Sequence, residues 1–271
     1  MQYSTFAAID IGSYDVILEI FEISKKQGIR SVDKICHRME LGKDTYTLGK
    51  IRPEMEEELC RVLADFVRIM EGYRVDAYRA MASSAISEAA NSLYVLGKIR
   101  QLTGLSVTVL SNSEQRFLGY KALAAMEDNF NKVIEKGTAI LDLDGGSFQI
   151  SLFDKDALVT TQNIRMGSLR VRERLAGIQS ETEHYEEMVE ELIWNEVSSF
   201  KKMYLKDRKI ENIMLIGDVF TDSVYQNIEE KTTKIISREN FNTWYEKISR
   251  QSPMELAVKL GIPLENASLM Y

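Results

Sequence analysis

The chain is poor in two residue types on which much enzyme chemistry depends. Its 271 residues include only two histidines, His37 and His184, and two cysteines, Cys36 and Cys60. Two isolated histidines make histidine-based catalysis unattractive, and we expect both to be surface residues. Two widely separated cysteines cannot form a disulfide scaffold and match no metal-binding motif.

Long apolar runs are also missing. No run approaches the ~20 residues that a membrane-spanning helix needs. The first residues, MQYSTF, lack the basic region and the cleavage site of a signal peptide. We therefore expect a cytoplasmic protein without membrane contacts.

Basic residues are outnumbered, with 34 Lys and Arg against 41 Asp and Glu and a net charge of −7. This balance argues against nucleic-acid binding and mildly against a long polyanionic substrate. A local basic cluster could still serve an anion: Arg165, Arg170, Arg172 and Arg174. Hydrophobic residues (45%) and charged residues (28%) occur at the levels of a soluble globular protein, and the length allows one large or two medium domains.

The most informative stretch is residues 138–152, TAILDLDGGSFQISL. An apolar run leads to Asp142, and a second strand follows Gly145, Gly146 and Ser147, which predicts a β-hairpin with a glycine turn. Successive N–H groups in such a turn can bind phosphate oxygens, and a carboxylate beside them can hold Mg²⁺. The same pattern also occurs in ordinary hairpins, so the purely structural interpretation stays open.

A second copy of this pattern occurs at residues 6–20, FAAIDIGSYDVILEI, with Asp10 followed by Gly12 and Ser13. Asp10 and Asp142 are 132 positions apart, which is about one domain length. Repetition at this spacing indicates a two-lobed clamp for phosphate or nucleotide.

Both halves read as strands first and alternating helices and strands afterwards. We therefore predict an α/β fold, duplicated and two-lobed, with lobes at residues 1–125 and 126–271 and a cleft between them. The expected elements of the first half are a strand at 30–39, a polar loop at 40–50, a helix from Pro53 to about Gly72, a strand at 73–82, a helix from 85 to 102 and a strand at 106–110. Those of the second half are a strand and turn at 156–167, a helix at 181–204, a strand at 212–217 and a helical remainder interrupted at Pro253.

Glu114 opens a further expected helix, at residues 111–126. A glutamate three positions after Ser111 is typical of a capping box, in which it would bond the helix start. Its position at a strand-to-helix junction is also where ligand-facing residues collect. The sequence leaves both interpretations open.

Five segments occur in an order that resembles a known family: AIDIGS at 8–13, ASSAISEA at 82–89, VLSNSEQ at 109–115, DLDGGSFQ at 142–149 and MGSLR at 166–170. They are similar to motifs of the exopolyphosphatase/guanosine pentaphosphate phosphohydrolase (Ppx/GppA) family, a branch of the sugar kinase, Hsp70 and actin-like superfamily. The resemblance covers nearly the whole chain, and it implies a duplicated actin-like (ribonuclease H-like) fold.

The resemblance also implies an activity, which is hydrolysis of a terminal phosphoanhydride bond in polyphosphate or in a phosphorylated guanosine nucleotide. Glu114 would orient the attacking water, and Asp142, with Asp10, would hold the Mg²⁺ cofactor. Phosphate oxygens would bind the backbone N–H groups of Gly12, Ser13, Gly145, Gly146 and Ser147. Relatives of this kind are usually homodimers.

Several positions depart from the family pattern. Tyr14 and Ile17 stand where the first hairpin usually has Asn and Arg, and Ser87 replaces a second arginine. Gln149 stands where the family has a glutamate. Two acids, Asp144 and Asp218, replace residues of the family's glycine-rich turns. The alternative hypothesis is therefore a degenerate member that binds a phosphate compound, a nucleotide or a partner protein without turnover. A sugar-kinase-like transferase is a third possibility, disfavoured because the adenosine-side glycine turn is absent.

Overall fold

The computed structural model describes residues 3–26, 28–126, 130–179, 184–206, 208–217, 237–260 and 264–267. It divides into two compact units, Met1–Leu118 and Gly119–Tyr271, each with its own sheet. The division falls inside one helix, as does the boundary expected after residue 125. Within the described ranges, every helix is too short or too polar to cross a lipid bilayer.

Unit 1 contains a five-stranded sheet in the order β3-β2-β1-β4-β5. Its strands are β1 Ser4–Ile11, β2 Asp15–Ser24, β3 Gly28–Arg38, β4 Ala77–Ala82 and β5 Val107–Val109. The first three strands form an antiparallel meander, whereas β4 runs parallel to β1 and β5 runs parallel to β4. Residues along β1 alternate between buried and more exposed positions, as expected when one face of a sheet covers a core.

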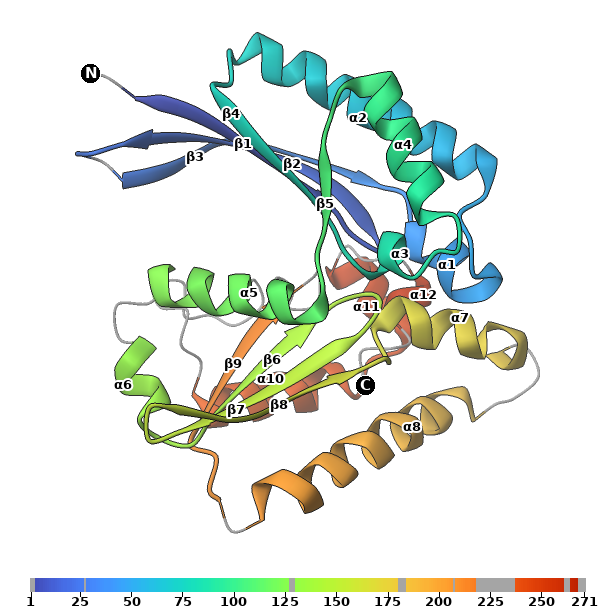
Figure 1. Cartoon of the computed structure of the whole chain (residues 1–271). Helices are drawn as coiled ribbons and strands as arrows, with labels where there is room; N and C mark the ends of the chain where they lie inside the picture. The colour runs from blue at the N-terminus through green and yellow to red at the C-terminus, as the bar shows by residue number, and fades with distance from the viewer. Residues whose placement is uncertain are drawn as a thin grey trace. The chain divides into compact units, whose positions relative to one another are not determined.

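Helices cover that buried face. The helices of unit 1 are α1 Leu41–Leu48, α2 Pro53–Gly72, α3 Ser84–Ser87 and α4 Ser92–Thr103. Figure 1 shows α2 and α4 side by side against the sheet, and their apolar faces join β1, β2 and β4 in one core. Helix α2 begins with Pro53 in its first turn and ends at Gly72, as predicted.

Two predictions for unit 1 were wrong. Most of the loop expected at 40–50 is helix α1, Leu41–Leu48. The buried Asp44 carboxylate of this helix accepts hydrogen bonds from the backbone N–H and Nε of Arg52, at 2.9 and 2.8 Å. The helix expected from residue 85 to 102 is broken into α3 and α4. The side chain of Asn91 bonds both backbone groups of Ile51 at this break, a contact between distant residues that local periodicity does not encode.

Unit 2 contains a four-stranded sheet in the order β8-β7-β6-β9. Its strands are β6 Thr138–Leu143, β7 Phe148–Asp154, β8 Ala157–Ile164 and β9 Asn212–Gly217. As in unit 1, the first three strands form an antiparallel meander and the fourth runs parallel to the first. The two units therefore share one strand order, which confirms the predicted duplication.

The described helices of unit 2 pack on both faces of this sheet. They are the end of α5 Asn112–Met126, α6 Phe130–Ile134, α7 Ser168–Gln179, α8 Tyr185–Phe200 with the π-helical turn η1 Lys201–Leu205, α10 Arg238–Ile248, α11 Pro253–Leu260 and α12 Leu264–Ala267. Tyr120 of α5 and Phe130 of α6 pack with Phe153 on one face. Phe200 of α8 packs with Leu152 on the other face.

The second half of the chain also departs from expectation. Helices α6 and α7 were not predicted. The helix expected at 181–204 is α8 followed by η1; residues 181–183 lie outside the described ranges. Short apolar patterns such as that of α7 become helical through packing, here of Val171 and Leu175 against Val189 of α8.

Candidate functional site

The hairpin of unit 1 carries three of the predicted site residues. Asp10 lies at the end of β1 and is exposed, with Ile17 and Met81 as its neighbours on β2 and β4. In the turn, the Gly12 N–H donates to the Asp15 carbonyl at 2.9 Å. That N–H is therefore occupied by the chain itself in this conformation.

Ser13 lies in a buried polar cluster. It is only 1% exposed, and its hydroxyl is 2.7 Å from the Tyr46 hydroxyl, which in turn is 2.8 Å from the Ser84 hydroxyl. The cluster joins the hairpin turn to α1 and α3, so the side chain of Ser13 fixes the turn. Any contribution of Ser13 to phosphate binding would come from its backbone.

Glu114 forms the capping box that the sequence allowed. Its Oε2 accepts from the backbone N–H of Ser111 at 2.9 Å and from the Ser111 hydroxyl at 2.7 Å, and Ser111 Oγ accepts the Glu114 N–H at 3.3 Å. These hydrogen bonds lower the pKa of the Glu114 carboxyl. An exposed, fully ionised carboxylate is a weak proton acceptor at neutral pH, although it can still orient a water molecule.

The strand order of unit 1 brings these residues to one edge of its sheet. Strands β1, β4 and β5 are parallel, with Ile11 beside Ala82 and Ala82 beside Val109. Asp10 and Glu114 lie at or just beyond the carboxyl ends of such strands, where ligands commonly bind in α/β folds.

The hairpin of unit 2 brings the other predicted residues together. Asp142 lies near the end of β6, and the turn after it is closed by the Asp144 N–H, which donates to the Ser147 carbonyl at 3.1 Å. The Gly145 N–H donates to the Asp144 carboxylate at 2.7 Å. The side chain of Asp144 therefore takes a donor that the sequence had suggested for phosphate.

Helix α7 holds this turn in place. The backbone N–H of Arg170 donates to the Gly145 carbonyl at 3.0 Å, and Arg170 Nε donates to the Gly146 carbonyl at 2.7 Å. The described residues contain no cis peptide bond, so each N–H points opposite to the carbonyl of its own peptide unit. The N–H groups of Gly146 and Ser147 belong to the same two peptide units and therefore point away from the bonded groups of Arg170.

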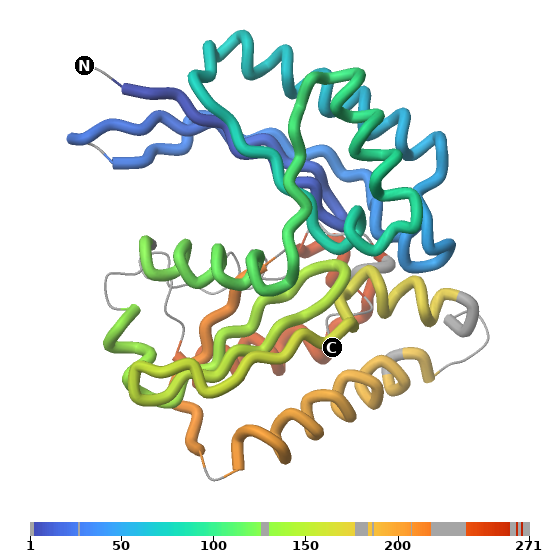
Figure 2. Tube along the Cα trace, in the orientation of Figure 1, coloured from blue at the N-terminus to red at the C-terminus, as the bar shows by residue number. Residues whose placement is uncertain are grey.

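Two glycines allow this close packing. A Cβ at Gly167, just before α7, would lie 2.2 Å from the Asp144 carbonyl oxygen. A Cβ at Gly217, which has a φ of +123° at the end of β9, would lie 1.9 Å from the Leu143 carbonyl oxygen. Figure 2 shows the start of α7 beside the tip of the β6–β7 hairpin. The variant turn residue Asp218 lies outside the described ranges.

Asp142 is the most electrostatically perturbed of these residues. Burial, with a smaller contribution from the nearby Asp144 carboxylate, raises its pKa from an ordinary 3.8 to about 6. Among the residues that the structure describes, no cation counters this effect. Burial and repulsion of this kind are typical of a carboxylate that binds a positive charge.

Two amide residues lie beside Asp142 on neighbouring strands. Gln149 is the register partner of Asp142 on β7, and Asn163 is the partner of Gln149 on β8. Gln149 Oε1 and Asn163 Oδ1 are buried without a hydrogen-bond partner. The sequence pattern gave no sign of Asn163, because only the strand register brings it here.

The donor set fits Mg²⁺ in this unit. Among the described residues, no three His, Cys, Asp or Glu side chains gather as a metal site. Mg²⁺ nevertheless accepts any oxygen ligand and needs few protein groups, since it keeps several waters. The Asp142 carboxylate and the unpartnered Gln149 Oε1 are oxygen ligands on adjacent strands.

The remaining predicted residues do not form a phosphate site of their own. Of the basic cluster, Arg170 supports the turn, whereas Arg172 is 5% exposed and bonds Glu173. Ser87, in the place of a family arginine, is exposed at the end of α3. Both histidines lie at the surface, as expected, with His184 exposed and His37 half-exposed, and each is paired with a glutamate.

A comparison of the sequence with family models matches the Ppx/GppA phosphatase family over residues 19–260, and the chain belongs to this family. It is 21% identical over 238 residues to a bifunctional 3-dehydroquinate synthase/phosphatase of Fusobacterium nucleatum, covering 83% of this chain and 34% of that protein. It is 25% identical over 144 residues to exopolyphosphatase 1 of Mycobacterium leprae, covering 53% of this chain and 41% of that protein. The chain thus spans well under half the length of these relatives.

Solved structures share the fold. The chain is similar to the Ppx/GppA family member of Aquifex aeolicus, with a TM-score of 0.74 and 19% identity over 99% of this chain and 87% of that one. An exopolyphosphatase from Cytophaga hutchinsonii gives a TM-score of 0.75 and 18% identity over 98% of this chain and 87% of that one. The family resemblance, the α/β class and the duplicated actin-like fold are confirmed. The cleft between the lobes stays a prediction.

Proposed function

We propose that this chain is a Mg²⁺-dependent phosphohydrolase that removes the terminal phosphate from polyphosphate or from a phosphorylated guanosine nucleotide. Membership of the Ppx/GppA phosphatase family supports the reaction class. The names of the mycobacterial relatives support polyphosphate as the first substrate to test.

One observation carries the proposal furthest. In unit 2, a desolvated carboxylate, Asp142, is followed by a turn whose Gly146 and Ser147 N–H groups point away from Arg170. Phosphoryl transfer needs donors for the phosphoryl oxygens and a charge-neutralising group beside them. This turn would supply the donors, and Asp142 is suited to hold a charge-neutralising metal ion.

In the proposed mechanism, the N–H groups of Gly146 and Ser147 bind oxygens of the terminal phosphate, and Arg170 keeps the turn rigid. Glu114 orients the attacking water with its ionised carboxylate. Asp142, with Asp10 from unit 1, would hold Mg²⁺, which when bound would neutralise charge on the phosphate oxygens. The chain thus contributes position and electrostatics, which are the main sources of catalysis in phosphoryl transfer.

A second candidate is a family member that binds a phosphate compound without hydrolysing it. Three observations favour it. The Glu114 carboxylate is held by Ser111, the Gly145 N–H is occupied by Asp144, and Gln149 provides no charge to the metal site. Such a protein would bind polyphosphate in calorimetry but release no phosphate.

The test exploits a matched pair of capping boxes. Glu255 caps α11 through Ser252 with the same three hydrogen bonds that Glu114 makes with Ser111. Glutamine is accepted in a capping box, so Glu114→Gln and Glu255→Gln should both fold. A phosphate-release assay on polyphosphate and on guanosine pentaphosphate then compares the two variants with the unmodified protein.

We expect Glu114→Gln to lose about 100-fold or more in rate, the usual contribution of a positioned acid or base, and Glu255→Gln to keep the full rate. Equal rates in the two variants would remove Glu114 from the mechanism. Binding of polyphosphate without phosphate release by the unmodified protein would establish the second candidate.

Two further proposals follow from the family resemblance. We propose a homodimer, which light scattering after size exclusion would test, and a cytoplasmic location, which cell fractionation would test. Neither affects the argument about the turn of unit 2.

A further inference from the structure

Strand β3 forms a free edge of the unit 1 sheet, and Figure 1 shows it as the outermost strand. Extended by one position, the β2–β3 register opposes Tyr14 to Met39, and the Met39 N–H donates to the Tyr14 carbonyl at 3.0 Å. Hydrogen-bonded and non-hydrogen-bonded pairs alternate along an antiparallel ladder. The backbone N–H and C=O groups of Lys34, Cys36 and Arg38 therefore point away from β2. In the part of the chain that the structure describes, no other backbone group bonds them.

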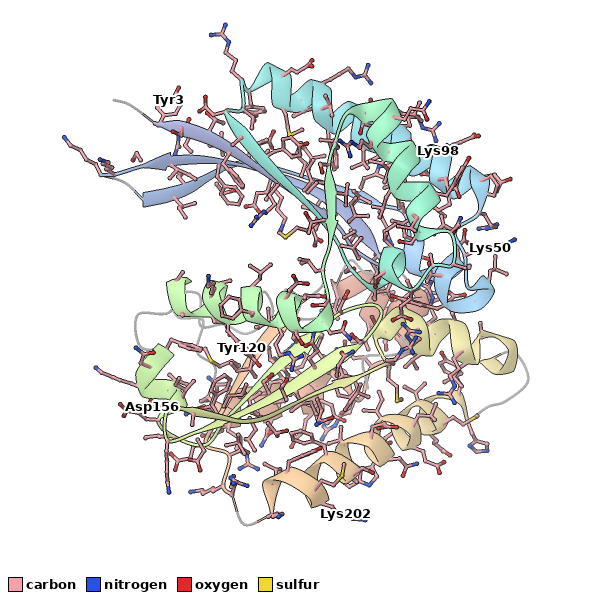
Figure 3. All side chains as sticks on the ribbon, in the orientation of Figure 1. Tyr3, Lys50, Lys98, Tyr120, Asp156 and Lys202 are labelled. Carbon is pink, nitrogen blue, oxygen red and sulfur yellow. The ribbon has the colours of Figure 1, made fainter. Side chains whose placement is uncertain are left out.

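A groove of about 410 Å³ lies beside this edge, between β3 and α2. Its apolar lining comes from Ile35 of β3 and from Val62, Phe66 and Ile69 of α2. Ile35 and Ile69 are only partly buried, so the groove presents apolar surface to solvent. Side chains project to both faces of the meander of β1, β2 and β3 (Figure 3), and those of β3 alternate between the groove and the opposite face.

A free strand edge beside an apolar groove matches the way in which an extended peptide adds to a sheet. Main-chain hydrogen bonds to the edge give affinity, and pockets accept alternate side chains of the peptide. Residues of an added strand that oppose Ile35 and His37 would project to the groove side, because directly opposed residues share a face. His37 marks this side, since its Nε2 lies 3.3 Å from Glu58 Oε1 of α2.

The charges around the groove narrow the class of partner. Lys34 on β3 and Arg61 on α2 form no ion pair within the described ranges, whereas the two acids of the lining, Glu58 and Asp65, are each bonded to a basic side chain. Two cations without an acidic partner suit an acidic segment. A second copy of this chain fits less well, because β3 has three Lys and Arg residues against one Asp, and basic side chains on an edge oppose self-pairing.

We propose that the β3 edge and the groove beside it bind an extended acidic segment of a partner protein as an additional strand of the unit 1 sheet. Alternate apolar side chains of the segment enter the groove, and Lys34 and Arg61 attract its acidic side chains. The proposal goes beyond the proposed function, since the groove lies on the α2 face of the sheet. Asp10 aligns with Ile17 of β2 and Cys36 of β3, whose side chains project to the other face.

The probe is a fluorescently labelled peptide of sequence SEVTVES with blocked ends, and fluorescence anisotropy at low salt measures its binding to the full chain. The pattern is symmetric, so it fits an added strand in either direction. It places both valines on the groove side and both glutamates on the opposite side. A peptide in which lysine replaces each glutamate should bind at least fivefold more weakly.

Two substitutions of Cys36 form a matched pair. Both Cys36→Pro and Cys36→Ala remove the thiol, but only proline removes the outward N–H. Proline is accepted on an edge strand where the N–H faces solvent, so both variants should fold, which thermal unfolding checks. We expect Cys36→Pro to bind the peptide on the order of tenfold more weakly, through the loss of a hydrogen bond, and Cys36→Ala to bind it fully.

A second pair tests the charge. Lys34→Glu should weaken binding about fivefold. Lys26→Glu changes the net charge equally but lies in the turn between β2 and β3, away from the groove, and should leave binding unchanged.

Hydrogen exchange of the unmodified chain locates the bound peptide. The peptide should slow exchange of the Lys34, Cys36 and Arg38 amides and leave those of Ile35 and His37, which already bond β2, unchanged. Exchange that slows at none of the three outward amides would overturn the proposal.

The proposal is also overturned if the peptide shows no saturable binding up to about 1 mM, or if Cys36→Pro binds as tightly as Cys36→Ala. Equal losses in Lys34→Glu and Lys26→Glu would overturn the assignment of charge. Self-association of the chain that the peptide does not disturb, and that Cys36→Pro abolishes, would assign the edge to a second copy instead of an acidic partner.

Discussion

The close approach of Gly167 to the β6–β7 turn gives a sharp test of the site. In Gly167→Ala the new Cβ would lie 2.2 Å from the Asp144 carbonyl oxygen and 2.4 Å from Gly145 C and Ser147 N. All three are backbone atoms, so no side chain can rotate out of the way. A normal contact needs roughly 3.5 Å, and the turn or the start of α7 must therefore shift by about 1 Å.

The size of the effect follows from this shift. Overpacking of this kind typically costs about 1–3 kcal/mol, which for a chain of this size lowers the unfolding midpoint by about 2–12 °C. A displacement of about 1 Å at a reacting centre can reduce the rate about 100-fold. We therefore expect Gly167→Ala to remain folded at 25 °C but to release phosphate about 100-fold more slowly.

Thermal unfolding and the phosphate-release assay measure the two effects separately. Gly119→Ala, within helix α5, is the control, since its Cβ would lie at an ordinary 3.8 Å from Ile216 Cδ1. That change should stabilise the protein by about 0.5–1 kcal/mol. Unchanged unfolding of Gly167→Ala would refute the packing argument. Lower stability with a full rate would show that the turn takes no part in the reaction.

Three further changes have defined outcomes. The pKa of Asp142 is raised to about 6 from 3.8, which corresponds to about 3 kcal/mol. Metal-free protein should therefore lose stability as the pH rises from about 4 to 6. Denaturant titrations of Asp142→Asn should show no such loss. The lowered pKa of Glu255 stabilises the folded chain above its ordinary value of 4.5 and ceases to do so as the pH falls below it; Glu255→Gln should therefore flatten the acid side of a melting-temperature profile. Asp44→Ala should destabilise unit 1 by about 1.5–3 kcal/mol in urea unfolding, because Arg52 loses a charged hydrogen-bond partner. A loss below about 0.5 kcal/mol, the scale of an ordinary surface change, would contradict this account of α1.

The sequence predicted the elements whose signals are local. Helix α2 was found from Pro53 and its apolar spacing, and both hairpins were found from glycine turns between alternating strands. Helix α1 was missed because its stability depends on the contact between Asp44 and Arg52 and on the Thr45 hydroxyl, which donates to the Ala85 carbonyl at 2.6 Å. These contacts span 8 and 40 residues, and neither leaves a periodic trace in the chain.

The site shows the same limit. Asp142 and its glycine turn could be identified from the sequence, as could the two interpretations of Glu114, a capping residue or a ligand-facing one. The supporting role of Arg170 was not, although the residue belongs to a segment that resembles a family motif. Asn163 has no sequence signal at all, because its place beside Gln149 is set by the pairing of β7 with β8.

The two copies of the hairpin have diverged in what surrounds them. In unit 1 the turn is tied by its own backbone, through Gly12 and Asp15, and by the buried hydroxyl of Ser13. In unit 2 the turn is tied from outside by Arg170, which engages carbonyls and leaves the N–H groups of the same peptide units pointing the other way. The duplicated topology therefore supplies two similar hairpins that are held in different ways, and the proposed function assigns phosphate binding to the one that the neighbouring helix supports.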